Sequence, residues 1–380
     1  MGRAGSEMMT LPRKATVSTL LKGPGSPETV WPLPSDKQPL KPLHCGGVIA
    51  QRAQAPGRLV GLDFAKGTLV LIMALYHWMN YFVSTDGSVY KYLRFLTPSF
   101  IFITGFLIAQ VYLGTARARS SSAPKRLLVR AAKLLAIVLI LNLATNATHV
   151  GISDITFYAL RTTILGSVAG SVPVVFSILF PIAYLLLLSS GLLVVSRWYS
   201  GIFHVASALS MGLAYSLDLT GTGGRGGYLQ LLSIGLFGAS LGHVSIARLN
   251  RIVDHRFGLL LFYIGYLAVI TYWGDGYLVQ VAGVCVTLAI MYWIGNTDPG
   301  SNKVRQTIVL LGRYSLFGYI IQILILQLLR RGMYSLRPGI GMSFLAFLAC
   351  IVLTILSIQL VDYLKKRSSA MNRLYTAVFS

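Results

Sequence analysis

The chain has 380 residues, of which 54% are hydrophobic and 12% are charged, and its mean hydropathy is +0.67. An ordinary soluble domain carries roughly 25% charged residues, so this composition excludes a soluble enzyme and indicates a polytopic membrane protein. The formal net charge is +22, but the basic residues lie in an N-terminal segment and between apolar runs. Loops that obey the positive-inside rule explain this charge better than nucleic-acid binding does.

Residues 1–57 differ in composition from the rest of the chain. They hold eight of the fourteen prolines and no apolar run that could form a signal-peptide core. Such a segment cannot bury enough apolar surface to fold, so the sequence predicts a disordered, basic cytosolic tail. We expect a membrane domain over residues 58–367 and a short cytosolic tail over residues 368–380.

Ten apolar runs follow, separated by Gly, Pro or charged residues. Each run is close to the roughly 20 residues that an α-helix needs to cross a bilayer. The runs are 60–82, 93–113, 132–150, 172–195, 201–217, 228–246, 257–273, 277–294, 307–329 and 342–363. The sequence therefore predicts an all-α, polytopic membrane helical bundle of about ten transmembrane helices. Residues 153–168 are too polar to cross the bilayer and are predicted to be partly buried or interfacial.

The distribution of Lys and Arg between successive loops predicts the orientation of the bundle. Placing residues 1–57 inside also places the basic stretches Arg117–Lys133 and Lys365–Arg367 inside. The opposite side then holds fewer basic residues, so the positive-inside rule predicts that both termini are cytoplasmic. Three arginines oppose this bias, and we expect them to contact an acidic acceptor or lipid phosphate. They are Arg330, Arg331 and Arg337.

The first run carries three ionisable side chains. At about 100° per residue, Asp63, Lys66 and His77 fall on one stripe of a helix. Ionisable groups are costly in lipid, so the stripe is predicted to face a polar cavity inside the bundle. Such a stripe is typical both of an active site and of a transport pathway.

Four stretches resemble motifs of the acyltransferase-3 family of integral-membrane acyltransferases. The first run is similar to the family's opening pattern at Leu62–Gly67 and at Tyr76-His77, with ten residues between the basic residue and the histidine as in the family. The others are similar to its Ser-Gly-Phe-Leu-Ile run, its basic motif before the third span and its late Leu-Gly-Lys motif. They are Phe100–Ile108, Arg126–Arg130 and Leu311–Ile320.

The resemblance implies a reaction and assigns residues to it. It implies transfer of an acetyl or succinyl group from acyl-CoA, a substrate and not a permanently bound cofactor, to a hydroxyl of a cell-envelope or exported saccharide. The acceptor would be a glycan or a lipid-linked saccharide, at the cell (inner) membrane. His77 would be the general base, since neutral imidazole accepts protons near neutral pH, and Asp63 is grouped with it as catalytic. The implied donor-binding cations are Lys66, Arg126, Arg130 and Arg313.

The sequence departs from the family pattern at three positions. Lys66 stands where arginine is usual, Thr104 replaces serine, and Gln322 replaces a histidine. Lysine keeps the positive charge but lacks the planar guanidinium that binds phosphate through two parallel hydrogen bonds. A catalytically inactive relative therefore stays open beside the enzyme, as does a transporter or flippase of an envelope precursor.

Each candidate residue also has a structural interpretation. His77 could be hydrogen-bonded between helices, and Asp63 could simply pair with Lys66. Several cations could form a positive-inside cluster or extend toward lipid headgroups without binding a ligand. These cations are Arg126, Arg130, Lys133 and Arg313.

Two further patterns predict no site. Gly221–Gly226 spells G-x-G-x-x-G, but no strand precedes it, so a flexible external loop is a better interpretation than a dinucleotide site. The histidines and the three cysteines lack metal-ligand spacing, so no metal site is predicted.

Overall fold

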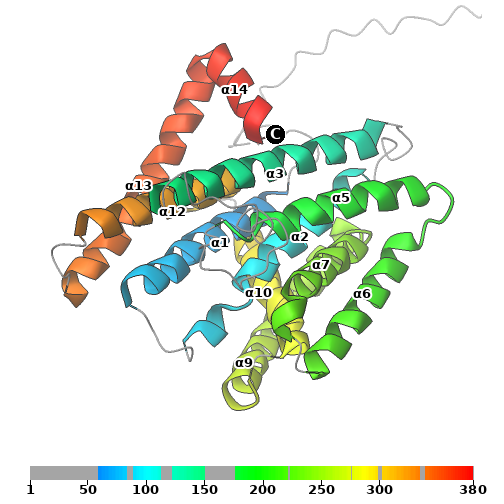
Figure 1. Ribbon diagram of the computed structural model, residues 1–380. Coiled ribbons are helices and arrows are strands. Elements are labelled where there is room, and N and C mark those ends of the chain that lie inside the picture. The colour runs from blue at the N-terminus through cyan, green and yellow to red at the C-terminus, as the bar shows by residue number, and fades with distance from the viewer. Residues whose placement is uncertain are drawn as a thin grey trace, which may run out of the picture. The chain divides into compact units, whose positions relative to one another are not determined.

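The computed structural model describes residues 59–83, 89–112, 122–149, 176–220, 223–274, 276–297, 302–333 and 339–379. The described residues form helices and turns and contain no strand, which confirms the predicted all-α fold for this part of the chain (Figure 1). The α-helices are α1 (Val60–Trp78), α2 (Leu96–Tyr112), α3 (Ser122–His149), α5 (Leu179–Val195), α6 (Ile202–Leu219), α7 (Gly223–Leu241), α8 (Ile246–Val253), α9 (Arg256–Tyr272), α10 (Tyr277–Thr297), α11 (Lys303–Arg313), α12 (Ser315–Met333), α13 (Ile340–Arg367) and α14 (Ser369–Phe379). A π-helix, η1 (Met79–Val83), and a 3-10 helix, η2 (Tyr90–Leu93), join α1 to α2.

Some predictions lie outside the described residues. These are the tail over residues 1–57, the interfacial segment 153–168 and the position of Arg337. Of the glycine-rich stretch, residues 221–222 are likewise outside. The backbone from Gly223 onward belongs to α7, so the predicted flexible loop is wrong for this part of the stretch.

Among the described helices, seven are long and apolar enough to cross a bilayer, and α7 with α8 makes an eighth if that pair is one span bent by 106°. The helices α5 and α9 are apolar but have 17 residues each. At about 1.5 Å per residue such a helix is roughly 25 Å long, against a hydrocarbon core of about 30 Å. The chain is thus a multi-pass membrane protein. Each predicted apolar run includes residues of at least one described helix, but length and composition support seven or eight spans among the described helices, where ten were predicted.

The ninth predicted run does not form one helix. The helix α11 ends at Arg313, and α12 begins at Ser315. Tyr314 between them leaves helical geometry, with φ −110° and ψ 28°, and its hydroxyl donates a 2.9 Å hydrogen bond to the carboxylate of Asp362 on α13. The tertiary contact fixes the break, so residues 307–329 are wrong as the bounds of a single span.

The helix α1 lies inside the bundle and packs against α10, α11, α12 and α13. Glycines make its contact with α11 close. A Cβ atom on Gly312 would overlap the carbonyl oxygen of Asp63, and one on Gly67 would overlap that of Ile308. Small residues allow such backbone contact between membrane helices. The contact fixes the first two turns of α1, which carry Asp63 and Lys66.

A second close contact positions α2 against α7. A Cβ atom on Gly105 would overlap the carbonyl oxygen of Gly235, so the backbone of α7 approaches α2 closely at this glycine. The neighbouring Thr104 donates a 2.8 Å hydrogen bond to the carbonyl of Phe100 within the same helix. Thr104 also lines the cavity described next.

Candidate active site

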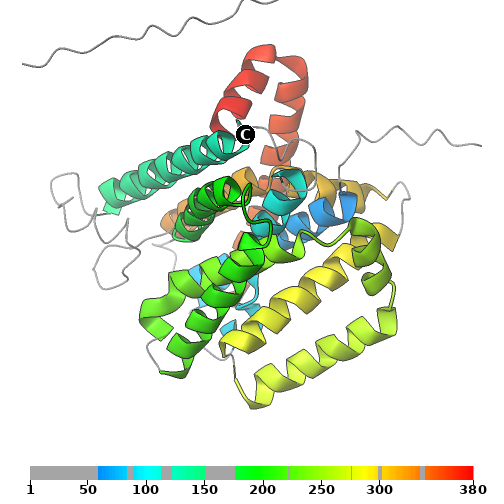
Figure 2. The ribbon, with the colours of Figure 1, turned by 90° about the vertical axis from the view of Figure 1, so that its right-hand side faces the viewer.

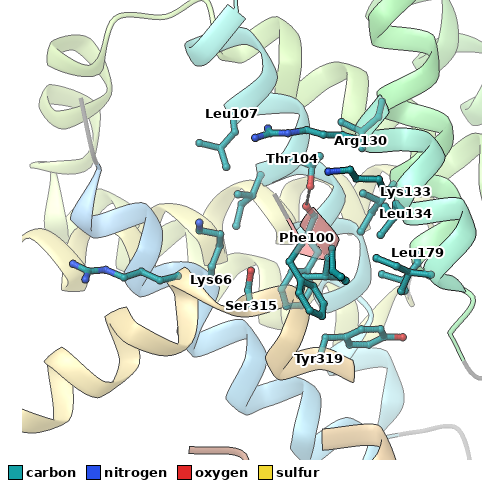
Figure 3. A pocket seen from close by; sticks show the side chains of 18 of the residues that line it. Lys66, Phe100, Thr104, Leu107, Arg130, Lys133, Leu134, Leu179, Ser315 and Tyr319 are labelled. Atoms are coloured by element: carbon teal, nitrogen blue, oxygen red, sulfur yellow. Dashed lines mark hydrogen bonds between the residues drawn. The ribbon is translucent and has the colours of Figure 1, made fainter. Parts of the chain in front are cut away.

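A cavity of about 490 Å³ opens among eight helices of the bundle, which are α1, α2, α3, α5, α11, α12, α13 and α14. Five cationic side chains line it, one from each of α1, α11 and α13 and two from α3, while no carboxylate is among its described lining residues (Figure 3). The cations are Lys66, Arg130, Lys133, Arg313 and Lys365. We call the end of the bundle that carries them the Lys66 end. The rest of the wall is mostly apolar, with Phe100, Leu134 and Leu179 among its side chains.

Lys66 reaches the cavity from the second turn of α1. Its ammonium pairs with the carboxylate of Asp63, 2.7 Å away and one turn earlier. Asp63 is buried, with 6% of the residue exposed, and does not line the cavity. The expected pairing of the two residues is confirmed. Asp63 therefore acts on the cavity by holding Lys66 in position.

The basic motif at the start of α3 divides between two environments. Arg130 and Lys133 line the cavity, whereas Arg126 is exposed and is not among the lining residues. Arg126 lies one turn, or about 6 Å, nearer the start of the helix. The structure therefore places three of the four predicted donor-binding cations together, and Arg126 apart from them. Arg313 reaches the same cavity from the last residue of α11.

His77 lies in the last turn of α1, eleven residues beyond Lys66, which is about 16 Å along the helix. Its Nε2 atom is buried and has no hydrogen-bond partner within the described chain. The predicted alternative, a histidine hydrogen-bonded between helices, thus finds no support at this nitrogen. An unpaired buried polar atom is costly in a folded protein and is common where a ligand later binds.

Tyrosine rings surround His77. The ring of Tyr81, from η1, stacks on it at 6.3 Å between centroids with an interplanar angle of 23°, as expected for a residue that orients the imidazole. Tyr76 contacts it edge-on at 5.4 Å. Arg330, one of the arginines that oppose the charge bias, lies 5.6 Å over the ring of Tyr81, so its observed partner is an aromatic ring. Asn80, also on η1, is exposed.

Tyr319, on α12, connects His77 to the cavity. Its ring centroid is 6.0 Å from that of His77, and the same side chain lines the cavity, where it lies below Phe100 in Figure 3. Only 6% of Tyr319 is exposed. Among the described lining residues, no other side chain makes a ring contact with His77.

Comparisons with protein-family models, with curated proteins and with solved structures give no match. Assignment of a function therefore depends on the sequence motifs and on the geometry of this cavity.

The prediction from sequence missed three features of the site: Lys365, Tyr319 and the helix α14. Lys365 was counted only in the charge bias, because its place on the cavity depends on where the end of α13 lies. Tyr319 belongs to the late motif, but nothing in the sequence places it beside His77. Residues 368–380 were expected to be a tail, whereas α14 forms part of the cavity wall. A signal for this helix was present: its apolar residues recur at helical spacing, as Met371, Leu374, Tyr375, Val378 and Phe379.

The chemistry available at the site is binding of an anion and proton transfer. Clustered cations with no lining carboxylate suit a ligand that carries several phosphate charges. A neutral imidazole with a buried, unpartnered nitrogen suits a proton acceptor. In the part of the chain that the structure describes, no group of three or more His, Cys, Asp or Glu side chains is arranged to hold a metal ion.

Proposed function

We propose that the chain is a membrane acyltransferase that moves an acetyl or succinyl group from acyl-CoA to a hydroxyl of a cell-envelope or exported saccharide. One observation carries the proposal. The cavity that collects Lys66, Arg130 and Arg313 also contains Tyr319, whose ring contacts His77. His77 itself does not line the cavity, so a polyanionic donor in the cavity and the proton acceptor would lie on the two sides of the Tyr319 ring.

Each end of the cavity has its own part in the proposed reaction. The cations at the Lys66 end bind the phosphates of coenzyme A through charge-assisted hydrogen bonds, and the extended pantetheine arm follows the apolar wall toward Tyr319. The distance of about 16 Å along α1 from Lys66 to His77 suits an arm of this kind. The thioester then lies beside Tyr319, within reach of His77.

The transfer step uses the unpartnered nitrogen. His77 Nε2 accepts the proton of the saccharide hydroxyl while the oxygen attacks the thioester carbonyl carbon. The new C–O bond forms, the C–S bond breaks, and the proton passes from His77 to the departing thiolate. The hydroxyl of Tyr319 donates a hydrogen bond to the carbonyl oxygen as negative charge develops on it. Asp63 serves as a positioning residue for Lys66.

The decisive experiment measures donor binding and acyl transfer separately. Purified protein in lipid nanodiscs is titrated with coenzyme A, and transfer is followed with labelled acetyl-CoA and succinyl-CoA. We expect His77→Ala to bind coenzyme A normally and to lose transfer by about 100-fold or more, the usual size of a general-base contribution. His255→Ala, which removes an exposed histidine that does not line the cavity, is the matched control. Full transfer by folded His77→Ala would refute the proposed role.

A cellular test separates the enzyme from the transporter and from an inactive relative. Surface glycans of a deletion strain are analysed by mass spectrometry after complementation with the parent or with His77→Ala. An acyl mass that only the parent restores supports the acyltransferase. Unchanged glycans with altered solute uptake would favour a transporter, in which a charged cavity also serves a transport pathway.

A further inference from the structure

The last described helix, α14, folds back toward the bundle from the end of α13. The backbone leaves helical geometry at Ser368, with φ −124° and ψ 121°, and α14 then turns back toward α3. Figure 2 shows the same fold-back for the red helix, seen from the side. Four residues of α14 belong to the cavity wall. They are Tyr375, Thr376, Val378 and Phe379.

The contacts between α14 and the bundle are aromatic and cationic. The ammonium of Lys365 lies 4.3 Å from the ring centroid of Tyr375 and 5.1 Å from that of Tyr314. The two tyrosine rings meet edge to face at 5.2 Å, and Phe379 meets Phe317 of α12 at 5.9 Å with perpendicular rings. Lys365 therefore lies against two rings, one on α14 and one on the fixed bundle.

The bundle side of this contact is firmly held. Tyr314 donates its hydroxyl hydrogen to Asp362, and the carboxylate of Asp362 pairs with Lys366 at 2.6 Å. On the other side, the described side chains of α14 make no hydrogen bond or ion pair to another helix. An isolated helix of 11 residues is only marginally stable in water, so α14 persists through its packing. The fold thus joins a hydrogen-bonded bundle to a helix that is held against it by ring and cation–ring contacts.

We propose that α14 is a lid over the Lys66 end of the cavity, held closed by the contacts of Lys365 with the rings of Tyr314 and Tyr375. When the lid is closed, α14 completes the wall around the cations. Arg130 and Arg313 are exposed even with α14 docked, whereas Lys66, Lys133 and Thr104 are partly buried and become accessible from the solvent at that end when the lid opens. The inference concerns access to the cavity, so it stands or falls independently of whether the ligand is an acyl-CoA.

A cysteine inside the cavity reports the state of the lid. Thr104→Cys is introduced into protein whose own cysteines, Cys45, Cys285 and Cys350, are replaced by Ser. Its alkylation by iodoacetamide, a small neutral reagent, is timed by mass spectrometry in nanodiscs. We expect removal of residues 369–380 to accelerate the reaction about tenfold or more, since four wall residues are lost. A control cysteine, Arg251→Cys on exposed α8, should react at one rate throughout.

Adjacent lysines on α13 give a matched pair of point variants. Lys365→Met removes the ammonium between the two rings, and we expect it to accelerate alkylation of Thr104→Cys several-fold. Removing a cation also raises the pKa of a nearby thiol and so slows its alkylation. A faster reaction of Thr104→Cys would therefore have to come from easier access of the reagent to the cavity. Lys366→Met, which removes a mostly exposed ammonium that pairs with Asp362, should change the rate less than twofold.

The outcomes decide the proposal in either direction. Equal alkylation rates in the parent, in Lys365→Met and in the shortened protein would overturn the lid, whether or not the protein transfers acyl groups. A rise in the rate at the control cysteine as well would show general loosening of the bundle and would equally overturn it. Acceleration confined to Thr104→Cys supports α14 as the lid.

Discussion

Arg126 and Arg130 are one turn apart on α3, and only Arg130 lines the cavity. Both side chains are exposed to a similar degree, so the pair separates ligand binding from the general charge of the surface. We expect Arg130→Gln to weaken coenzyme A binding about tenfold, the loss of one charge-assisted hydrogen bond. Arg126→Gln should change the Kd less than about twofold. Titration of each variant with coenzyme A in nanodiscs at two salt concentrations tests this. Equal losses of affinity in the two variants would mean that coenzyme A responds to the general positive charge of the surface and not to Arg130 in particular.

Tyr319 and Tyr76 both contact the ring of His77, but only Tyr319 lines the cavity. Tyr319→Phe keeps the ring contact and removes the hydroxyl. We expect acyl transfer to fall about 100-fold, as when one donor to a developing oxyanion is lost, while the Kd for coenzyme A stays unchanged. Tyr76→Phe should transfer at the parental rate. Similar losses in both variants would mean that the hydroxyls support only the packing around His77.

At the scale of residues, the sequence predicts which side chains share one face of a helix. It does not predict which side chains from different helices meet at one cavity. Spacing alone placed Asp63, Lys66 and His77 on one stripe of α1, and the pair of Asp63 and Lys66 is present. The stripe was predicted to face a polar cavity, but of the three residues only Lys66 lines the cavity. Whether Arg126 or Lys365 reaches the same cavity depends on how α3 and α13 pass α1. No local pattern contains that information. The prediction therefore included Arg126, which lies apart from the cavity, and left out Lys365, which lines its wall.

At the scale of elements, the contact between α1 and α11 sets the position of Lys66. Gly312→Ala would place a methyl group against the carbonyl oxygen of Asp63, where backbone and not a movable side chain must give way. We expect a loss of about 1–3 kcal/mol in the free energy of unfolding, typical of overpacking, with weaker coenzyme A binding. In contrast, Gly258→Ala on α9 meets no atom within 4 Å and should be neutral or stabilising by up to about 1 kcal/mol. Thermal unfolding of both variants in detergent is the measurement, and a loss of stability is expected for Gly312→Ala alone.

The docking of α14 carries its own pH dependence. Burial raises the pKa of Tyr375 from 10.0 to about 12, and burial, followed by the nearby Asp362, also raises the pKa of Tyr314. A phenol whose pKa is raised in the docked state stabilises docking fully below about pH 10, and that contribution is lost as the pH rises through about 12. We therefore expect the lid to stay closed from about pH 6 to about pH 9 and to detach above about pH 10.

Spin labels at Leu374→Cys and Leu128→Cys, both exposed positions, measure the distance between α14 and α3 as the pH changes. Tyr375→Phe is the control, because it removes the ionisable group and leaves Lys365 and Tyr314 in place. The distance in this variant should change less above about pH 10 than in the parent. An identical change in both proteins would assign the pH dependence to Lys365 or Tyr314.

The elements themselves were largely predictable from the sequence, because each apolar run is a local property of about 20 residues. The exceptions depend on tertiary contacts. The break at Tyr314 is fixed by Asp362, 48 residues later. The helix α14 was overlooked because its apolar residues were too few for a span, although their spacing was helical.

At the scale of the whole molecule, the cavity collects cations from stretches far apart in the sequence at one end of the bundle. The same stretches were predicted to be cytoplasmic from the count of Lys and Arg between successive apolar runs. The donor proposed for the cavity, acyl-CoA, is a cytosolic metabolite that does not cross membranes. The charge bias and the proposed donor therefore predict the same orientation, with the Lys66 end of the cavity in the cytosol.

Labelling of single cysteines in intact cells tests that orientation. Arg251→Cys and Lys366→Cys are exposed at the Lys66 end, where Tyr292 of α10 bonds to Asn250 of α8, and Asn80→Cys is exposed beyond His77. An impermeant maleimide added outside should label Asn80→Cys alone and should label the other two only after the cells are opened. The proposed reaction needs a donor that binds from the cytosol. Labelling of Lys366→Cys from outside would show that the bundle has the opposite orientation, and it would rule out acyl-CoA as the ligand of this cavity.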